Sequence, residues 1–185
     1  MKRTNLAAMI TAVLLLVGCE KTETAAPPAM LLTSQAVDHY CGMTVLEHPG
    51  PKGQIILQSR DEPVWFTSSR DAVAFTKLPE EPKDIAAIYV SDMSRASSWE
   101  HPGNDNWIDA RGAHYVIDSS LRGGMGAAET VPFSSREAAA AFAVKNGGKI
   151  VGFEEIPESY VLGADTSAGA GHGDTNNEEG SAISG

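Results

Sequence analysis

The chain has little cysteine, few basic residues and no long hydrophobic run. Only 2 of its 185 residues are cysteine, which excludes a disulfide-dense scaffold, and the spacing of Cys and His does not fit a closed zinc site of about four ligands. Lys and Arg number 14 against 24 Asp and Glu, for a formal net charge of −10. This acidity argues against a nucleic-acid partner.

The longest apolar run lies at the start of the chain. Lys2 and Arg3 precede an apolar stretch that ends at Gly18-Cys19. The stretch is shorter than the roughly twenty residues that a transmembrane anchor needs, and it resembles a bacterial lipoprotein signal. We therefore predict a signal peptide at 1–18, lipidation of Cys19 with palmitate-type acyl chains, and a flexible lipidated tether at 19–35.

The composition of the rest predicts two structured units and a tail. Residues 36–92 form the expected first unit, 93–110 a connector and 111–162 the second unit. Residues 163–185 are rich in Gly, Ala, Ser, Asn and Glu, which predicts a disordered tail. His172 in that tail is a weak candidate for recruiting a metal.

A repeat supports the division into two units. Val64–Ser68 and Val131–Ser135 lie 67 positions apart, and an alanine-rich stretch follows each of them. Such a repeat indicates that one small unit was duplicated. The expected fold class is α+β, with two tandem ββαβ units.

Each unit is read from its apolar pattern and its turn residues. Strands are expected at 40–46, 54–59, 64–67 and 85–91 in the first unit, and at 113–119, 127–133 and 149–155 in the second. Helices are expected from Ser68 to about Leu78 and from Ser135 to about Asn146, with Ser134 as the second N-cap.

Sulfur is the chemically informative element of this sequence. After lipidation of Cys19 the only free thiol is Cys41, which stands two residues before Met43. On an extended segment this spacing places both sulfurs on one face. Met125 lies among glycines, which leave its thioether unshielded, and Met93 ends an expected strand.

The sulfur side chains indicate a binding site for a soft metal ion and not a packing role in the core. Cys and Met commonly fill gaps in a core, but an unpaired exported thiol would oxidise without function. Thiolate with thioether favours Cu(I) on grounds of softness. The predicted ligands are Cys41, Met43 and Met125, with Met93 as a further candidate, while His39 is more simply a surface histidine.

Several segments together resemble the NosL family, the accessory lipoproteins of nitrous oxide reductase. They run in family order from about Asp38 to Ile156: Cys41-Gly42-Met43, Pro49–Gly53, Tyr89–Met93, Trp99–Pro102, Ile108–Ala110 and Gly124–Gly126. The resemblance implies a fold with two ββαβ units, similar to that of organomercurial lyase.

The resemblance also implies a function in denitrification. Members of the family are periplasmic Cu(I) chaperones, not enzymes, that deliver copper for the copper-sulfide centre of nitrous oxide reductase together with an ABC-type Nos membrane complex. Carried over, Cys41, Met43 and Met125 match the family's sulfur positions, and Met93 matches its Asp-Met motif. The expected location is the periplasmic side of a bacterial membrane, inner or outer, held by the lipid anchor.

Two other classes stay open. A thiol enzyme would use Cys41 as nucleophile and need a base such as His39 or His114, whereas an adaptor would dock proteins without metal. The sequence also leaves open the number of copper ligands, a role for histidine or Cu(II), and the oligomeric state. One candidate docking face comprises Asp92, Glu100 and Asp105.

Overall fold

The structure is a computed structural model that describes residues 25–163. The predicted signal peptide, the lipidated Cys19 and the tail with His172 lie outside this range. Residues 25–163 contain no helix that is long and apolar enough to cross a membrane.

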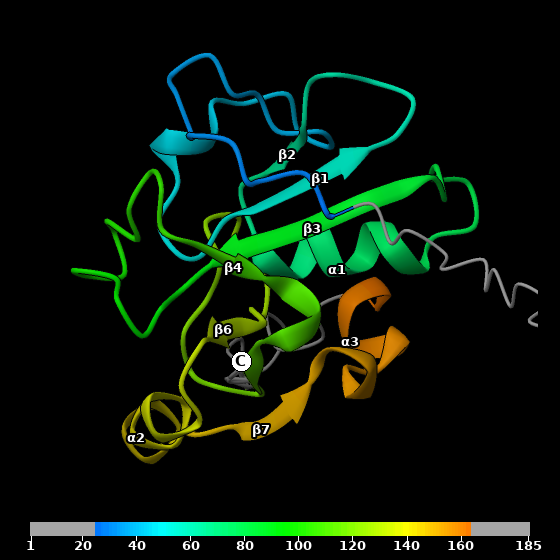
Figure 1. Cartoon of the computed structure of the whole chain (residues 1–185). Coiled ribbons are helices and arrows are strands. Elements are labelled where there is room, and N and C mark those ends of the chain that lie inside the picture. Colours follow the sequence, from blue (N-terminus) through cyan, green and yellow to red (C-terminus); the bar gives the residue numbers. More distant parts are fainter. Residues whose placement is uncertain (1–24, 164–185) are drawn as a thin grey trace, which may run out of the picture.

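Two antiparallel sheets organise the described chain (Figure 1). The first has the order β2-β1-β3-β4 and comprises β1 (Gly53–Leu57), β2 (Val64–Phe66), β3 (Ile85–Ser91) and β4 (Trp107–Asp109). The second has the order β6-β5-β7 and comprises β5 (His114–Ile117), β6 (Val131–Phe133) and β7 (Lys149–Gly152).

The described residues also form three α-helices and three 3₁₀ turns: α1 (Ser69–Lys77), α2 (Arg136–Asn146), α3 (Glu158–Leu162), η1 (Val45–Glu47), η2 (Ala110–Gly112) and η3 (Phe153–Glu155). In each half, two strands, a helix and a third strand follow one another, and the third strand pairs with the first. The predicted α+β class with two ββαβ units is confirmed.

The central strand β1 explains the layering of the first sheet. All its residues are buried, as expected for a strand covered on both faces. On one face, Ile55 packs with α1 in a core that η2, β5, η3 and α3 also line. On the other face, Leu32, Ala36 and Val45 pack against Trp65 and Trp107.

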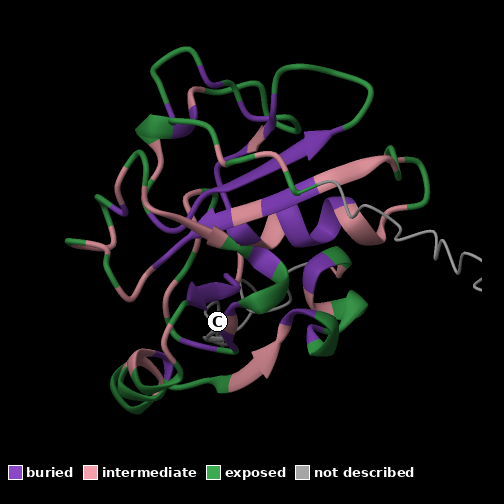
Figure 2. Ribbon diagram, viewed as in Figure 1, coloured by how far each residue is buried: buried purple, intermediate pink, exposed green. Residues whose placement is uncertain are grey.

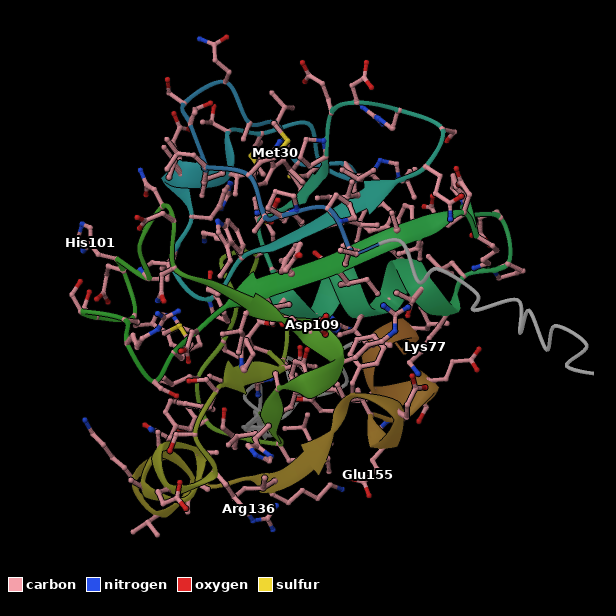
Figure 3. The ribbon with its side chains drawn as sticks, in the orientation of Figure 1. Met30, Lys77, His101, Asp109, Arg136 and Glu155 are labelled. Carbon is pink, nitrogen blue, oxygen red and sulfur yellow. The ribbon has the colours of Figure 1, made fainter. Side chains whose placement is uncertain are left out.

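The chain before β1 therefore forms a cover over the sheet, on the side opposite α1 (Figure 1). Figure 2 shows the loops of this cover largely exposed, above the buried β1. Figure 3 places Met30 in the cover, where its backbone N–H and C=O pair with the side chain of Gln54. The prediction of a flexible tether to residue 35 is wrong for residues 25–35, because Leu32 is buried and these backbone contacts fix the segment.

Both long helices begin at serine caps. The hydroxyl of Ser68 accepts the N–H of Asp71, and that of Ser135 accepts the N–H of Ala138. The second cap is one residue later than predicted, because Ser134 instead donates its N–H and hydroxyl to the carboxylate of Asp92.

Asp92 fastens the connector to the second unit. It is fully buried and also accepts the N–H of Ser94 and the Nε–H of Arg95. Burial opposes its ionisation, but the hydrogen bonds from Ser134 and Ser94 outweigh burial and lower the pKa of Asp92. A docking face that includes Asp92 is therefore wrong, although Glu100 and Asp105 are exposed.

Other element predictions need correction. The expected strand at 40–46 is a turn followed by η1, because Gly42 takes a φ of +70° and the chain reverses there. The strand expected at 127–133 begins only at Val131, and that at 149–155 gives way to η3 after Gly152. The connector contains β4, which pairs with β3, and α3 follows η3 near the end of the described chain.

The close approach of α1 to β1 gives a test of this packing. A Cβ on Gly53 would clash with the Cβ of Ala72, so Gly53→Ala should lower the free energy of unfolding by about 1–3 kcal/mol. Urea unfolding measures this loss. Gly112→Ala is the matched control, since a Cβ there meets nothing within 4 Å; equal stability of the two variants would contradict the packing.

Candidate metal centre

Cys41 lies at the tip of a turn that the Asp38 carboxylate holds. One carboxylate oxygen accepts the N–H groups of Tyr40 and Cys41, each at 2.9 Å, and the other accepts the N–H of Thr67 at 2.6 Å. The loop is closed by a β-bridge between Val37 and Thr44. The free thiol of Cys41 is thus presented to solvent on a fixed backbone.

The electrostatics of the turn keep this thiol protonated at rest. Burial and the neighbouring carboxylate of Asp38 both raise the pKa of Cys41, and they outweigh the backbone hydrogen bond from Met43. A metal ion that binds the sulfur must displace this proton.

Met43 belongs to the same loop. Its carbonyl accepts the N–H of Asp38 at 2.9 Å, and its side chain is 38% exposed. The strand that was to align the two sulfurs is absent, since Gly42 reverses the chain between them. The loop nevertheless carries both sulfurs at the surface, because Cys41 and Met43 are both exposed.

Met125 comes from the second unit, on a glycine turn. The turn is closed by a hydrogen bond from the N–H of Gly126 to the carbonyl of Gly123, and Met125 is 52% exposed. Gly124 lies so close to His48 that an added Cβ would stand 2.6 Å from the Cβ of His48. The turn from Gly123 to Gly126 therefore rests against the chain segment that follows Met43.

A buried carboxyl group makes a second link between the glycine turn and the first unit. Glu129 is 1% exposed, and one of its oxygens accepts the N–H of Arg70 at 2.8 Å and the hydroxyl of Ser68 at 3.3 Å. Glu129 thereby caps α1 from the second unit, next to Thr67, which is bound to Asp38. Its other oxygen faces Gly123, where an added Cβ would lie 2.6 Å away.

Lys52 connects the segment around His48 to Thr67 through hydrogen bonds to backbone carbonyls. Its buried ammonium group donates to the carbonyls of His48, Pro49 and Thr67, at 2.5, 3.1 and 3.3 Å. Burial lowers the pKa of Lys52 to about 8, against the opposing charges of Glu129 and Asp38. Lys52 and Glu129 could not be singled out from the sequence, because only their burial in the folded chain distinguishes them from other charged residues.

The remaining candidates lie in other surroundings. Met93 packs against the core cluster of Val116, Val131 and Phe133. His39 pairs with Glu81 at 3.1 Å and lays its ring against Phe66 and Phe75.

Other polar and aromatic side chains near the sheets pack into the fold. His114 is half-buried on β5, and Tyr115 is buried with its hydroxyl donating to the carbonyl of Ala110. His48 escaped notice in the sequence, yet its Nε2 is buried without a hydrogen-bond partner among the described residues.

The donor set narrows the metals that fit. Residues 25–163 contain no group of three or more His, Cys, Asp or Glu side chains that could hold an ion. A site at the Cys41 turn therefore depends on thioether sulfur, which suits soft ions and not Zn²⁺, Mg²⁺ or Ca²⁺.

The buried carboxyl group of Glu129 predicts a pH dependence of stability. Burial raises its pKa from 4.5 to about 8, and burial with the charge of Asp38 raises that of Asp71 to about 6. Between pH about 5 and 8 the folded state thus holds more protons than the unfolded state, so the free energy of unfolding should fall as pH rises.

Glu129→Gln should flatten this decline, because the amide does not titrate. Urea unfolding at several pH values measures the slope, and Glu154→Gln, at an exposed position, serves as the control. A wild-type slope that Glu129→Gln leaves unchanged would show that Glu129 is not its source.

Comparison with known proteins places the chain in a family. The NosL family profile matches residues 29–161. The copper-binding lipoprotein NosL of Achromobacter cycloclastes is 48% identical over 132 residues, which are 71% of this chain and 68% of that protein. The protein of the same name from Stutzerimonas stutzeri is 37% identical over 123 residues, which are 66% of this chain and 63% of that protein.

A solved structure agrees in fold. The crystal structure of the copper chaperone NosL from Shewanella denitrificans superposes with a TM-score of 0.67 at 36% identity, covering 72% of this chain and 99% of that one. These relatives carry the names of a binding protein and a chaperone, not of an enzyme. The profile match and the identity to the Achromobacter protein show that this chain belongs to the NosL family.

Proposed function

We propose that this chain is a copper chaperone that binds Cu(I) through the thiolate of Cys41 and the thioethers of Met43 and Met125. The observation that carries the proposal is the contact between the glycine turn of Met125 and His48, in the segment that follows the loop of Cys41 and Met43. The loop of Cys41 and Met43 is held by Asp38, and the glycine turn of Met125 rests against His48. All three sulfur side chains are exposed.

The chemistry of this donor set suits a carrier. A thiolate with thioethers prefers Cu(I), and a thioether carries no proton in the ordinary pH range, so only Cys41 loses a proton when the ion binds. Few ligands at an open surface also permit release to a recipient. The names of the relatives from Achromobacter cycloclastes and Shewanella denitrificans support copper as the cargo.

The recipient we propose is nitrous oxide reductase, whose copper-sulfide centre would be assembled with this copper. An ABC-type Nos membrane complex would take part. The chain would act on the periplasmic side of a bacterial membrane, anchored through lipidated Cys19. The family membership and the lipoprotein names of its relatives support this assignment.

The thiol-enzyme alternative finds no support in the geometry. A nucleophilic cysteine needs a lowered pKa or an adjacent base. The pKa of Cys41 is raised instead, and His39 is engaged with Glu81. Met93 stays a candidate ligand by family motif, although its packing in the second core gives it another role.

Anaerobic competition with a chromophoric Cu(I) chelator tests the ligand set. Cys41→Ser should abolish competitive binding, because it removes the only charged ligand. Met43→Leu and Met125→Leu keep the volume and should each weaken affinity by about tenfold, or about 1.4 kcal/mol. Met30→Leu is the matched control, since Met30 is 44% exposed but lies outside both sulfur-bearing loops, where its backbone pairs with the side chain of Gln54.

Two results would contradict the ligand set. Binding that survives Cys41→Ser would remove the thiolate from the site. Affinity that falls equally in Met30→Leu and Met125→Leu would show that the thioether of Met125 has no specific role.

Delivery requires a separate test in cells. In a denitrifying strain that lacks its own copy of the gene, the wild-type chain should restore nitrous oxide reduction, and Cys41→Ser should not. Copper bound per reductase molecule measures the transfer directly. Full restoration by Cys41→Ser would instead favour the metal-free adaptor.

A further inference from the structure

Exposed apolar side chains gather around the proposed copper site. In the described chain the loop from Val37 to Thr44, the turn η1 after it and the glycine turn together expose large hydrophobic residues. We call this set the Cys41 patch: Val37 at 52% exposure, Tyr40 at 45%, Met43 at 38%, Leu46 at 38% and Met125 at 52%. Exposed apolar side chains on neighbouring loops indicate a candidate interaction surface.

The patch is built on fixed backbone. Asp38 and the Val37–Thr44 bridge hold the loop. The ring of Tyr40 lies against His39 and Phe66, with ring centroids 4.8 and 5.8 Å apart. A surface held in this way loses little conformational entropy when a partner binds.

A cavity opens beside the patch. It has a volume of about 170 Å³ and lies between η1 and the connector loop, lined among others by Leu32, Leu46, His48, Glu100 and Pro102. Such a recess beside an apolar surface suits one long anchoring side chain of a partner. Lys52 also lines the cavity, but its ammonium group is bound to three backbone carbonyls, so the carboxylate of Glu100 at the wall favours a basic one.

The rim of the patch is acidic. Glu47 is exposed beside Leu46. Glu80 and Glu81 lie near Tyr40, where their charges add to burial in raising the pKa of the phenol. The chain as a whole carries a formal net charge of −10. The rim would repel a second copy of this chain and anionic lipid headgroups, and it would attract a basic protein surface.

We infer that the Cys41 patch is the docking surface for the copper recipient, a protein face with an apolar centre, a basic rim and an Arg or Lys that enters the cavity beside Leu46. This inference rests on the proposed function. The patch surrounds the cargo sulfurs, so a recipient seated on it excludes water from the ion while the ligands exchange.

Lysine substitutions at residues of the Cys41 patch that are not proposed copper ligands test this docking surface. Val37→Lys and Leu46→Lys should weaken association of the Cu(I)-loaded chain with purified copper-free nitrous oxide reductase or the purified Nos membrane complex by at least about tenfold. Their Cu(I) affinity should equal that of the wild type. Val144→Lys is the matched control, because Val144 is 89% exposed on α2, outside the patch.

Reversal of the rim tests the charge argument. Glu47→Lys should slow association at low salt and reduce its salt dependence, since steering by the rim is lost. The same measurement on Glu154→Lys, an exposed glutamate of η3, should show a smaller effect. Equal effects in both variants would indicate that only net charge matters and would overturn the acidic rim.

Three further outcomes would overturn the inference. In the first, Val37→Lys and Leu46→Lys associate with the reductase and with the Nos membrane complex as tightly as the wild type does. The second is a wild-type dimer in sedimentation that these variants dissociate. The third is binding to phosphatidylglycerol vesicles that they abolish. If the wild-type chain did not bind Cu(I) at all, the proposed function would be refuted instead. Failure of the docking surface and failure of the proposed function are therefore distinguishable.

Discussion

The carboxylate of Asp38 is the interaction on which the site depends. It accepts three backbone N–H groups, two from the turn of Cys41 and one from Thr67, which follows β2. Each of these donors would otherwise need water or another partner, and a buried donor left alone costs about 1–3 kcal/mol. The same carboxylate raises the pKa of the thiol it positions. The turn thus gains rigidity, while the thiol holds its proton until an ion replaces it.

The second unit packs against the first through contacts that cross between the halves. Glu129 caps α1 from the other half of the molecule, and Gly124 permits the glycine turn to lie against His48. Lys52 fastens the backbone between these points through three carbonyls. The packing of the two ββαβ units against each other therefore holds the glycine turn of Met125 against the segment that follows Met43.

The sequence predicted the regular part of this structure well. The caps near Ser68 and Ser135 and the apolar strand at 85–91 are local signals, and they lie at or within one residue of their predicted positions. The turn at Cys41 was missed although part of its signal is local, because Asp38 accepts the N–H groups of Tyr40 and Cys41. Only the bond from Thr67, which is distant in sequence, could not be predicted. The roles of Glu129 and Lys52 also depend on tertiary burial. Their residue types alone predict exposed charges.

The central claim is that the loop of Cys41 and Met43 and the glycine turn of Met125 bind one copper ion. X-ray absorption at the copper edge of the Cu(I)-loaded protein, labelled with selenomethionine, tests it most directly. The account predicts copper–selenium scattering beside a copper–sulfur shell, and Met125→Leu should weaken the selenium signal without removing it. Absence of copper–selenium scattering, or a signal indifferent to Met125→Leu, would contradict a site shared between the two units.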